Sequence, residues 1–156
     1  MQNFNTKLEE WDKAMIMHMK KWSMPMARFA IFLVYFWFGI LKVLGTSPAN
    51  PLVDALLAQT MPGVTFAQFI VAFGVIEVLI GIMFLIPTLT RLAIFALCLH
   101  LITTIMPLFV LQQATWQSFL VPTLEGQYII KNILIVAAAI GILAHTHILK
   151  KENKHV

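Results

Sequence analysis

The sequence is short of cysteine, of charge and of long basic tracts, and each shortage excludes a class of protein. Cys98 is the only cysteine among 156 residues, which excludes an intrachain disulfide, a CxxC redox pair and a cysteine-based zinc site. Charged residues make up 12% of the chain, against about 25% in soluble domains. The basic residues behind the net charge of +4 form no long tract, so nucleic-acid binding is not expected.

Apolar residues fill the chain instead, at 60% of the sequence and a mean hydropathy of +0.84. They gather in four stretches, at about residues 26–45, 66–86, 89–111 and 127–149. Each is close to the ~20 residues that cross a bilayer core as a helix. We therefore predict an all-α fold, an integral membrane four-helix bundle over residues 25–149 whose main partner is the lipid bilayer.

The polar start of the chain, residues 1–24, predicts an amphipathic interfacial helix. Its apolar residues recur every three or four positions, with the lysines largely elsewhere; they are Phe4, Leu8, Trp11, Met15, Met19 and Trp22. This pattern suits a helix lying among lipid headgroups, with docking on a partner's groove as the alternative. Ser23 is expected to cap the next helix, with Pro25 just inside it. Trp11, Trp22 and Trp116 are the expected interface anchors.

Lysine and arginine are absent from the two loops, 46–65 and 112–126, that connect the stretches on one side. They gather in the start of the chain, in the turn at Arg91 and in the charged tail 150–156. By the positive-inside rule, both termini are expected in the cytoplasm, which agrees with four spans.

Ionisable residues occur inside the apolar stretches, where a charge costs roughly 2.5 to 3.5 kcal/mol on insertion scales. At 1.5 Å per residue, Glu77 and His100 both lie near the bilayer centre, and Lys42 and Lys131 lie roughly 10 Å nearer the outer face. Glu77 can therefore contact His100 directly, or a lysine side chain can extend down to it. Glu125 would then neutralise the charge of the second lysine near the outer membrane surface. Either these pairs only specify helix packing, or they line a cavity for a quinone head, another small ligand or a proton path.

No metal site is expected. Haem would need a second axial ligand at the depth of His100, whereas His145 and His147 fall near the cytoplasmic end of the fourth stretch. Methionines near the N-terminus, such as Met15 and Met19, could favour Cu(I), but a flexible apolar face toward lipid is their commoner use. No cofactor is assigned, and a quinone is the candidate ligand.

Three segments resemble the DoxX-like superfamily of small membrane proteins, within it the YkgB branch, which includes a reactive chlorine resistance membrane protein. They are WFGILKVLG at 37–45, GVIEVLIGIMFLIPTLTR at 74–91 and LEGQYIIKNILIVAAA at 124–139, and the resemblance covers about residues 28–144. The residues that match the motifs of the family are Gly39 and Lys42 in the first span, Glu77 and Gly81 in the second, and Glu125, Gly126 and Lys131 at the entry to the fourth.

The resemblance implies a four-helix bundle in the bacterial inner membrane, and links to redox or oxidative-stress physiology, including a subunit of a thiosulfate-quinone oxidoreductase. We expect an accessory component in redox homeostasis or stress resistance, and no catalytic residue is assigned. One alternative is a membrane subunit of a quinone-linked oxidoreductase with a redox-protein partner. A second alternative is a homo-oligomeric transporter of a small solute or protons.

Overall fold

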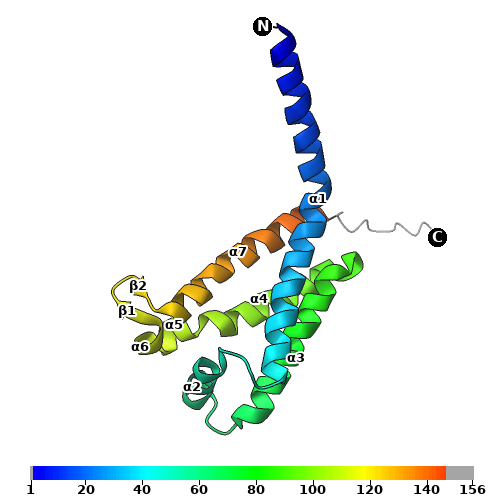
Figure 1. Cartoon of the computed structure of the whole chain (residues 1–156). Helices are drawn as coiled ribbons and strands as arrows, with labels where there is room; N and C mark the ends of the chain where they lie inside the picture. The colour runs from blue at the N-terminus through cyan, green and yellow to red at the C-terminus, as the bar shows by residue number, and fades with distance from the viewer. Residues whose placement is uncertain (1, 147–156) are drawn as a thin grey trace, which may run out of the picture.

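The computed structural model describes residues 2–146, with side chains from Lys7 onward, and shows an all-α bundle (Figure 1). Four helical segments are long and apolar enough to cross a membrane, and the chain is a membrane protein. The expected tail 150–156 and the end of the fourth stretch lie outside the described residues. The elements are α1 (Gln2–Val43), α2 (Asn50–Thr60), α3 (Phe66–Leu85), the 3₁₀ turn η1 (Pro87–Leu89), α4 (Thr90–Ile105), α5 (Pro107–Val110), α6 (Gln112–Thr115), β1 (Trp116–Ser118), β2 (Val121–Pro122) and α7 (Leu124–Ala144).

Helix α1 is continuous, so the expected helix start at Ser23 is wrong. Pro25 lies inside α1, and the Ser23 hydroxyl donates to the Lys20 carbonyl at 3.0 Å instead of capping a new helix. A proline removes one backbone hydrogen bond, and here the flanking turns carry the helix across that gap. The 42 residues of α1 are about 63 Å long, twice a ~30 Å hydrocarbon core, and the N-terminal half extends beyond the bundle (Figure 1).

Glycines bring α1 and α3 into close contact. A Cβ atom on Gly39 would lie 2.7 Å from the Gly74 carbonyl oxygen, and one on Gly74 would lie 2.7 Å from the Gly39 carbonyl oxygen. Two turns further along α3, a Cβ on Gly81 would lie 3.0 Å from the backbone nitrogen of Phe36. Small residues of this kind let membrane helices approach backbone to backbone, and α1 and α3 form the tightest pair of the bundle.

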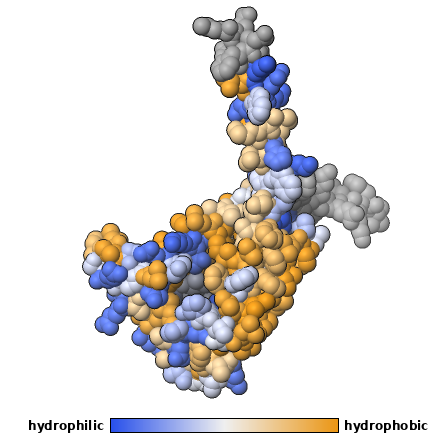
Figure 2. All heavy atoms as spheres, viewed as in Figure 1, coloured by the Kyte–Doolittle hydropathy of each residue, from blue (hydrophilic) through white to orange (hydrophobic). Residues whose placement is uncertain are grey.

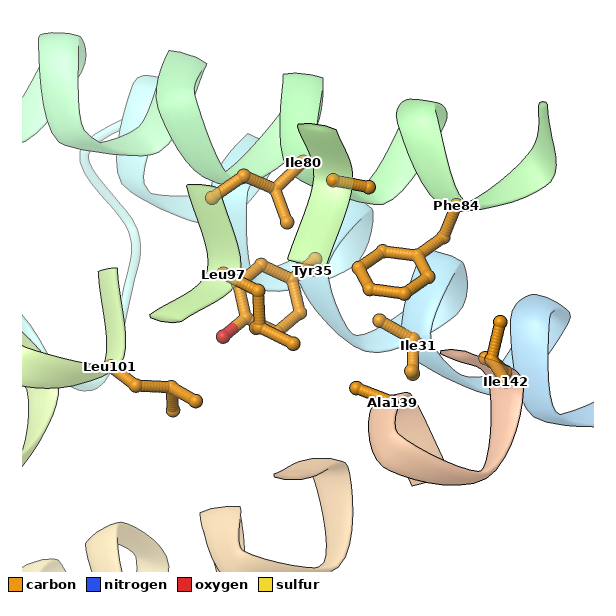
Figure 3. Packing of buried hydrophobic residues seen from close by; sticks show 9 residues of the cluster. Ile31, Tyr35, Ile80, Phe84, Leu97, Leu101, Ala139 and Ile142 are labelled. Atoms are coloured by element: carbon orange, nitrogen blue, oxygen red, sulfur yellow. The ribbon is translucent and has the colours of Figure 1, made fainter. Parts of the chain in front are cut away.

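The hydrophobic core lies toward the end of the bundle where α3 turns into α4 (Figure 3). It combines residues from α1, α3, α4 and α7, which are Ile31, Tyr35, Ile80, Phe84, Ala93, Leu97, Leu101, Ala139 and Ile142. Beside it, the Arg28 guanidinium donates to the Phe84 carbonyl at 3.1 Å, near the last turn of α3. A cation there is favourable because the helix C-terminus carries partial negative charge.

The opposite end of the bundle carries more structure than the sequence predicts. The first loop contains the helix α2, the third stretch ends in the separate short helix α5, and the second loop contains α6 and a small antiparallel pair of β1 with β2. Helix α7 begins at Leu124, three residues before the expected span, because the Thr123 side chain accepts a hydrogen bond from the Gly126 backbone at 3.2 Å. Gly126 leaves no room for a side chain beside the Thr115 backbone.

The surface has the distribution expected for a membrane protein (Figure 2). Hydrophilic residues gather around α2, α6 and the β1–β2 pair, while apolar residues cover the flanks of the long helices. Leu79, Phe95, Ile102 and Leu134 are all more than half exposed on these flanks. In water such a surface would be unfavourable, whereas lipid chains cover it at no cost.

Candidate functional site

The close contact of α1 and α3 places Lys42 beside Glu77. Gly39 lies three residues before Lys42 and Gly74 three before Glu77, so each glycine shares a helix face with the charge. A Cβ on Gly74 would lie 2.9 Å from the Lys42 Cβ, which shows how closely the lysine passes α3. The two glycines therefore set the distance between the charges.

Glu77 joins three helices through its two carboxylate oxygens. Lys42 Nζ donates to Oε2 at 2.5 Å, and His100 Nε2 from α4 lies 3.0 Å from Oε1. The three side chains are 4 to 8% exposed. We call Lys42, Glu77 and His100 the polar cluster. With a neutral histidine its formal charge is zero, the cheapest state for ionisable groups in an apolar interior.

Aromatic rings surround the histidine of the polar cluster. The Phe73 ring stacks on the His100 ring with centroids 4.7 Å apart, and the Tyr35 ring meets it edge-on at 5.3 Å. Lys42 Nζ also lies 5.7 Å from the Phe73 centroid, within the range of a cation–π contact. These rings shield the charges from lipid and restrict the orientation of the imidazole.

The two nitrogens of His100 have different surroundings. Nδ1 lies 3.4 Å from the Tyr35 hydroxyl and 3.3 Å from the Thr104 hydroxyl. Nε2 is close to Glu77 Oε1, but the oxygen is off the N–H direction, so Nε2 has no aligned hydrogen-bond partner among the described residues. The contact with Glu77 is thus electrostatic, and a buried N–H without an acceptor costs about 1 to 3 kcal/mol.

The other two predicted site residues lie elsewhere. Lys131 is exposed on α7, with Nζ 5.2 Å from the Tyr128 ring centroid. Glu125 is exposed in the first turn of α7. A carboxylate there interacts favourably with the partial positive charge of the helix N-terminus. No ion pair between them is present in the described part of the chain, so the expected balance of Lys131 by Glu125 is not seen. The lysine beside Glu77 is Lys42.

The expected interface tryptophans differ in exposure. Trp11 is 79% and Trp22 49% exposed on α1. Trp116 is half-buried in β1, and its indole N–H donates to the Leu108 carbonyl at 3.0 Å. Trp116 therefore holds the β1–β2 pair against α5.

Tyr35, Phe73 and Thr104 belong to the site and were missed by the sequence analysis. A signal for each was present, because Tyr35 lies seven residues before Lys42, Phe73 four before Glu77 and Thr104 four after His100. These spacings place each residue on the same helix face as a member of the polar cluster. The residues were overlooked because aromatic and threonine side chains are common in membrane helices and carry no charge.

An apolar groove of about 510 Å³ lies along the flank of α4 and α5, facing α7. Its lining includes Cys98, Leu101, Ile105, Phe109 and Val136. Most of the lining residues of α4, such as Cys98, Ile102 and Ile105, share one helix face. His100 lies on the opposite face of α4, so the groove is at the depth of the polar cluster but is separated from it by the helix. The apolar lining of the groove suits a hydrocarbon chain.

The polar cluster offers one cation, one anion and one imidazole. Only two of its side chains, Glu77 and His100, are metal ligands of the usual kinds, and no group of three or more such side chains occurs in the part of the chain that the structure describes. These three groups can form hydrogen bonds and exchange protons with a small polar group. No family model, curated protein or solved structure matches the chain.

Proposed function

We propose that the chain is a DoxX-like protein of the bacterial inner membrane that binds the head group of a quinone, or of a similar small carbonyl ligand, at the polar cluster. In this proposal it serves redox homeostasis or oxidative-stress resistance as an accessory component, with both termini in the cytoplasm. The observation that carries the proposal is the buried Nε2 of His100, which has no aligned acceptor among the described residues and lies beside the ion pair of Lys42 and Glu77.

Helix packing alone explains the polar cluster less well. A pair of opposite charges is enough to specify which face of α3 meets α1, and Lys42 with Glu77 already supplies it. Adding an imidazole whose N–H lacks an aligned partner weakens the packing, because the unmade hydrogen bond costs stability. A ligand oxygen that accepts from Nε2 would recover that cost, which is the usual reason for a strained polar group at a binding site.

A quinone matches both parts of the site. Its carbonyl oxygen accepts a hydrogen bond from an imidazole N–H, and its planar ring can stack beside Phe73, which already stacks on His100. Its isoprenoid chain is apolar and would extend among the lipid chains that cover the exposed flanks of the bundle. The ligand class thus follows from an acceptor at one end and a hydrocarbon chain at the other.

The alternative of an oxidoreductase subunit uses the same quinone site and adds a redox-protein partner that supplies electrons. No described side chain of the polar cluster can supply electrons, so in that case the partner holds the redox cofactor. A chain purified with such a partner would favour the subunit, and a chain purified alone would favour the accessory role.

Native mass spectrometry of protein extracted gently with its lipids tests the proposal. We expect quinone mass on the wild type and on Lys131→Gln, a control that changes an exposed lysine outside the polar cluster. We expect it to be lost in Glu77→Gln and in the double variant Lys42→Met/Glu77→Gln. The double variant is uncharged, so it separates loss of the site from loss of the fold. Equal quinone in all four proteins, or none in any, would contradict the proposal.

A further inference from the structure

His100 has a hydrogen-bond partner prepared for each of its two protonation states. The Thr104 hydroxyl donates to the His100 carbonyl at 3.1 Å, so its hydrogen is already used, and its lone pairs face Nδ1 at 3.3 Å. The Tyr35 hydroxyl lies 3.4 Å from the same nitrogen and can donate to it. One neighbour of Nδ1 is therefore set to accept and the other to donate.

The carboxylate of Glu77 decides which ring nitrogen carries the proton in the neutral histidine. A bare Nε2 would hold its lone pair 3.0 Å from the negative Oε1, and the two would repel even though the oxygen lies off the ring-nitrogen axis. Nε2 is therefore protonated, and Nδ1 accepts from the Tyr35 hydroxyl. If a second proton arrives at Nδ1, the new N–H donates to Thr104, whose oxygen accepts without losing its own donor bond.

The net charge of the site determines when His100 can hold a second proton. Lys42 and Tyr35 from α1 and Glu77 from α3 are the titratable groups in contact with His100 or its carboxylate partner, and α7 adds none to these contacts within the described residues. With the Lys42–Glu77 pair neutral overall, an imidazolium would leave a net positive charge in an apolar interior, which is costly. The cost disappears if a negative charge enters the site at the same time.

We propose that the polar cluster is proton-coupled: His100 takes one proton from solvent onto Nδ1 when an anionic oxygen ligand, such as a deprotonated hydroxyquinone, binds at Nε2. This inference rests on the proposed function and adds the charge state of the ligand. The ligand oxyanion accepts from Nε2–H, the Nδ1–H donates to Thr104, and the net charge of the site stays at zero. No electron is transferred in this step. A neutral quinone binds to the neutral histidine with no proton uptake.

Two naphthoquinones of similar size serve as probes. 2-Hydroxy-1,4-naphthoquinone is an anion at neutral pH, and 2-methyl-1,4-naphthoquinone is neutral. Calorimetric titration of the full chain in detergent, in two buffers that differ in protonation enthalpy, gives the number of protons taken up with each probe. We expect close to one proton for the anionic probe and none for the neutral probe.

Matched threonine variants locate the proton. Thr104→Val removes the acceptor beside Nδ1 and should weaken the anionic probe about tenfold to a hundredfold, the loss of one hydrogen bond to a charged group, while leaving the neutral probe unchanged. Thr103→Val is the control, because the Thr103 hydroxyl donates to the same His100 carbonyl at 2.7 Å and makes no contact with Nδ1.

Each other outcome overturns the inference in a distinguishable way. If both probes bind with no proton uptake, or only the neutral probe binds, the coupling is wrong and the proposed quinone site stands. If the two threonine variants weaken the anionic probe equally, Nδ1 is not the proton acceptor. If neither probe binds the wild type, the proposed function fails and this inference fails with it. The proton count uses the wild type, so it does not depend on how the variants fold.

Discussion

The contact between Lys42 and Glu77 predicts strong energetic coupling between the two residues. The atoms are 2.5 Å apart and the side chains are 7 and 8% exposed, so each charge depends on the other for compensation. Removing one member of a buried pair costs about 3 to 5 kcal/mol, because the remaining charge stays buried and unpaired. Removing both leaves no charge to bury.

Lys42→Met should be the more costly single change, at about 3 to 5 kcal/mol, because Glu77 lies in the middle of α3 and cannot reach water. Glu77→Gln should cost about 3 kcal/mol, at the lower end, since Lys42 lies in the last turn of α1 and its chain can extend toward the membrane surface. The double variant should be more stable than the sum of the two costs implies, by about 2 to 3 kcal/mol.

Equilibrium unfolding in mixed micelles, followed by tryptophan fluorescence as denaturing detergent is added, measures all four free energies of unfolding. The control cycle is Lys131→Met with Glu125→Gln, two exposed residues with no mutual contact, whose costs should be small and additive. If the costs of Lys42→Met and Glu77→Gln add to within about 0.5 kcal/mol, the two side chains do not compensate each other and the described site is wrong.

Three further predictions concern other parts of the chain. Gly39→Ala should destabilise the bundle by about 1 to 3 kcal/mol, because its Cβ would overlap the α3 backbone, whereas Gly141→Ala, which has open space around it, should cost nothing in the same unfolding assay. Reporter fusions at the two termini should report the same, cytoplasmic, side of the membrane, and opposite sides would refute the expected topology. If the exposed stripe of α1 docks on lipid headgroups by bending at Pro25, brominated lipids should quench Trp11 fluorescence in a variant that keeps only this tryptophan. If aqueous iodide quenches the Trp11 fluorescence and brominated lipids do not, the N-terminal half of α1 lies in water and the docking on lipid is wrong.

The four membrane helices could be predicted from the sequence because apolar length alone identifies them. The same counting at 1.5 Å per residue placed Lys42, Glu77 and His100 within reach of one another in depth. The residue count gives the depth of a side chain in the membrane but not the helix face on which it lies. Lys42 and Lys131 therefore could not be distinguished as partners of Glu77. The missing information was the helix face, and Gly39, three residues before Lys42, carries it.

Other features of the fold could not be predicted for physical reasons. Pro25 suggested a helix boundary, but one missing hydrogen bond does not break a helix whose flanking turns are intact. The β1–β2 pair involves five residues in total, too few for an alternating pattern to be recognised. The contacts of Tyr35 and Thr104 with His100 depend on how α1 and α4 cross, and a single sequence does not encode that angle in any local pattern.

Photochemical crosslinking tests whether the polar cluster binds the quinone head. A short-chain quinone with a photoreactive group on its ring is illuminated with the full-length protein, and the labelled residues are mapped by mass spectrometry. We expect labels next to the polar cluster, at Phe73 and Tyr35. An unlabelled quinone should suppress these labels, and the double variant Lys42→Met/Glu77→Gln should abolish them. Labels confined to the lipid-facing groove at Ile105 and Phe109, unchanged in that variant, would contradict this expectation.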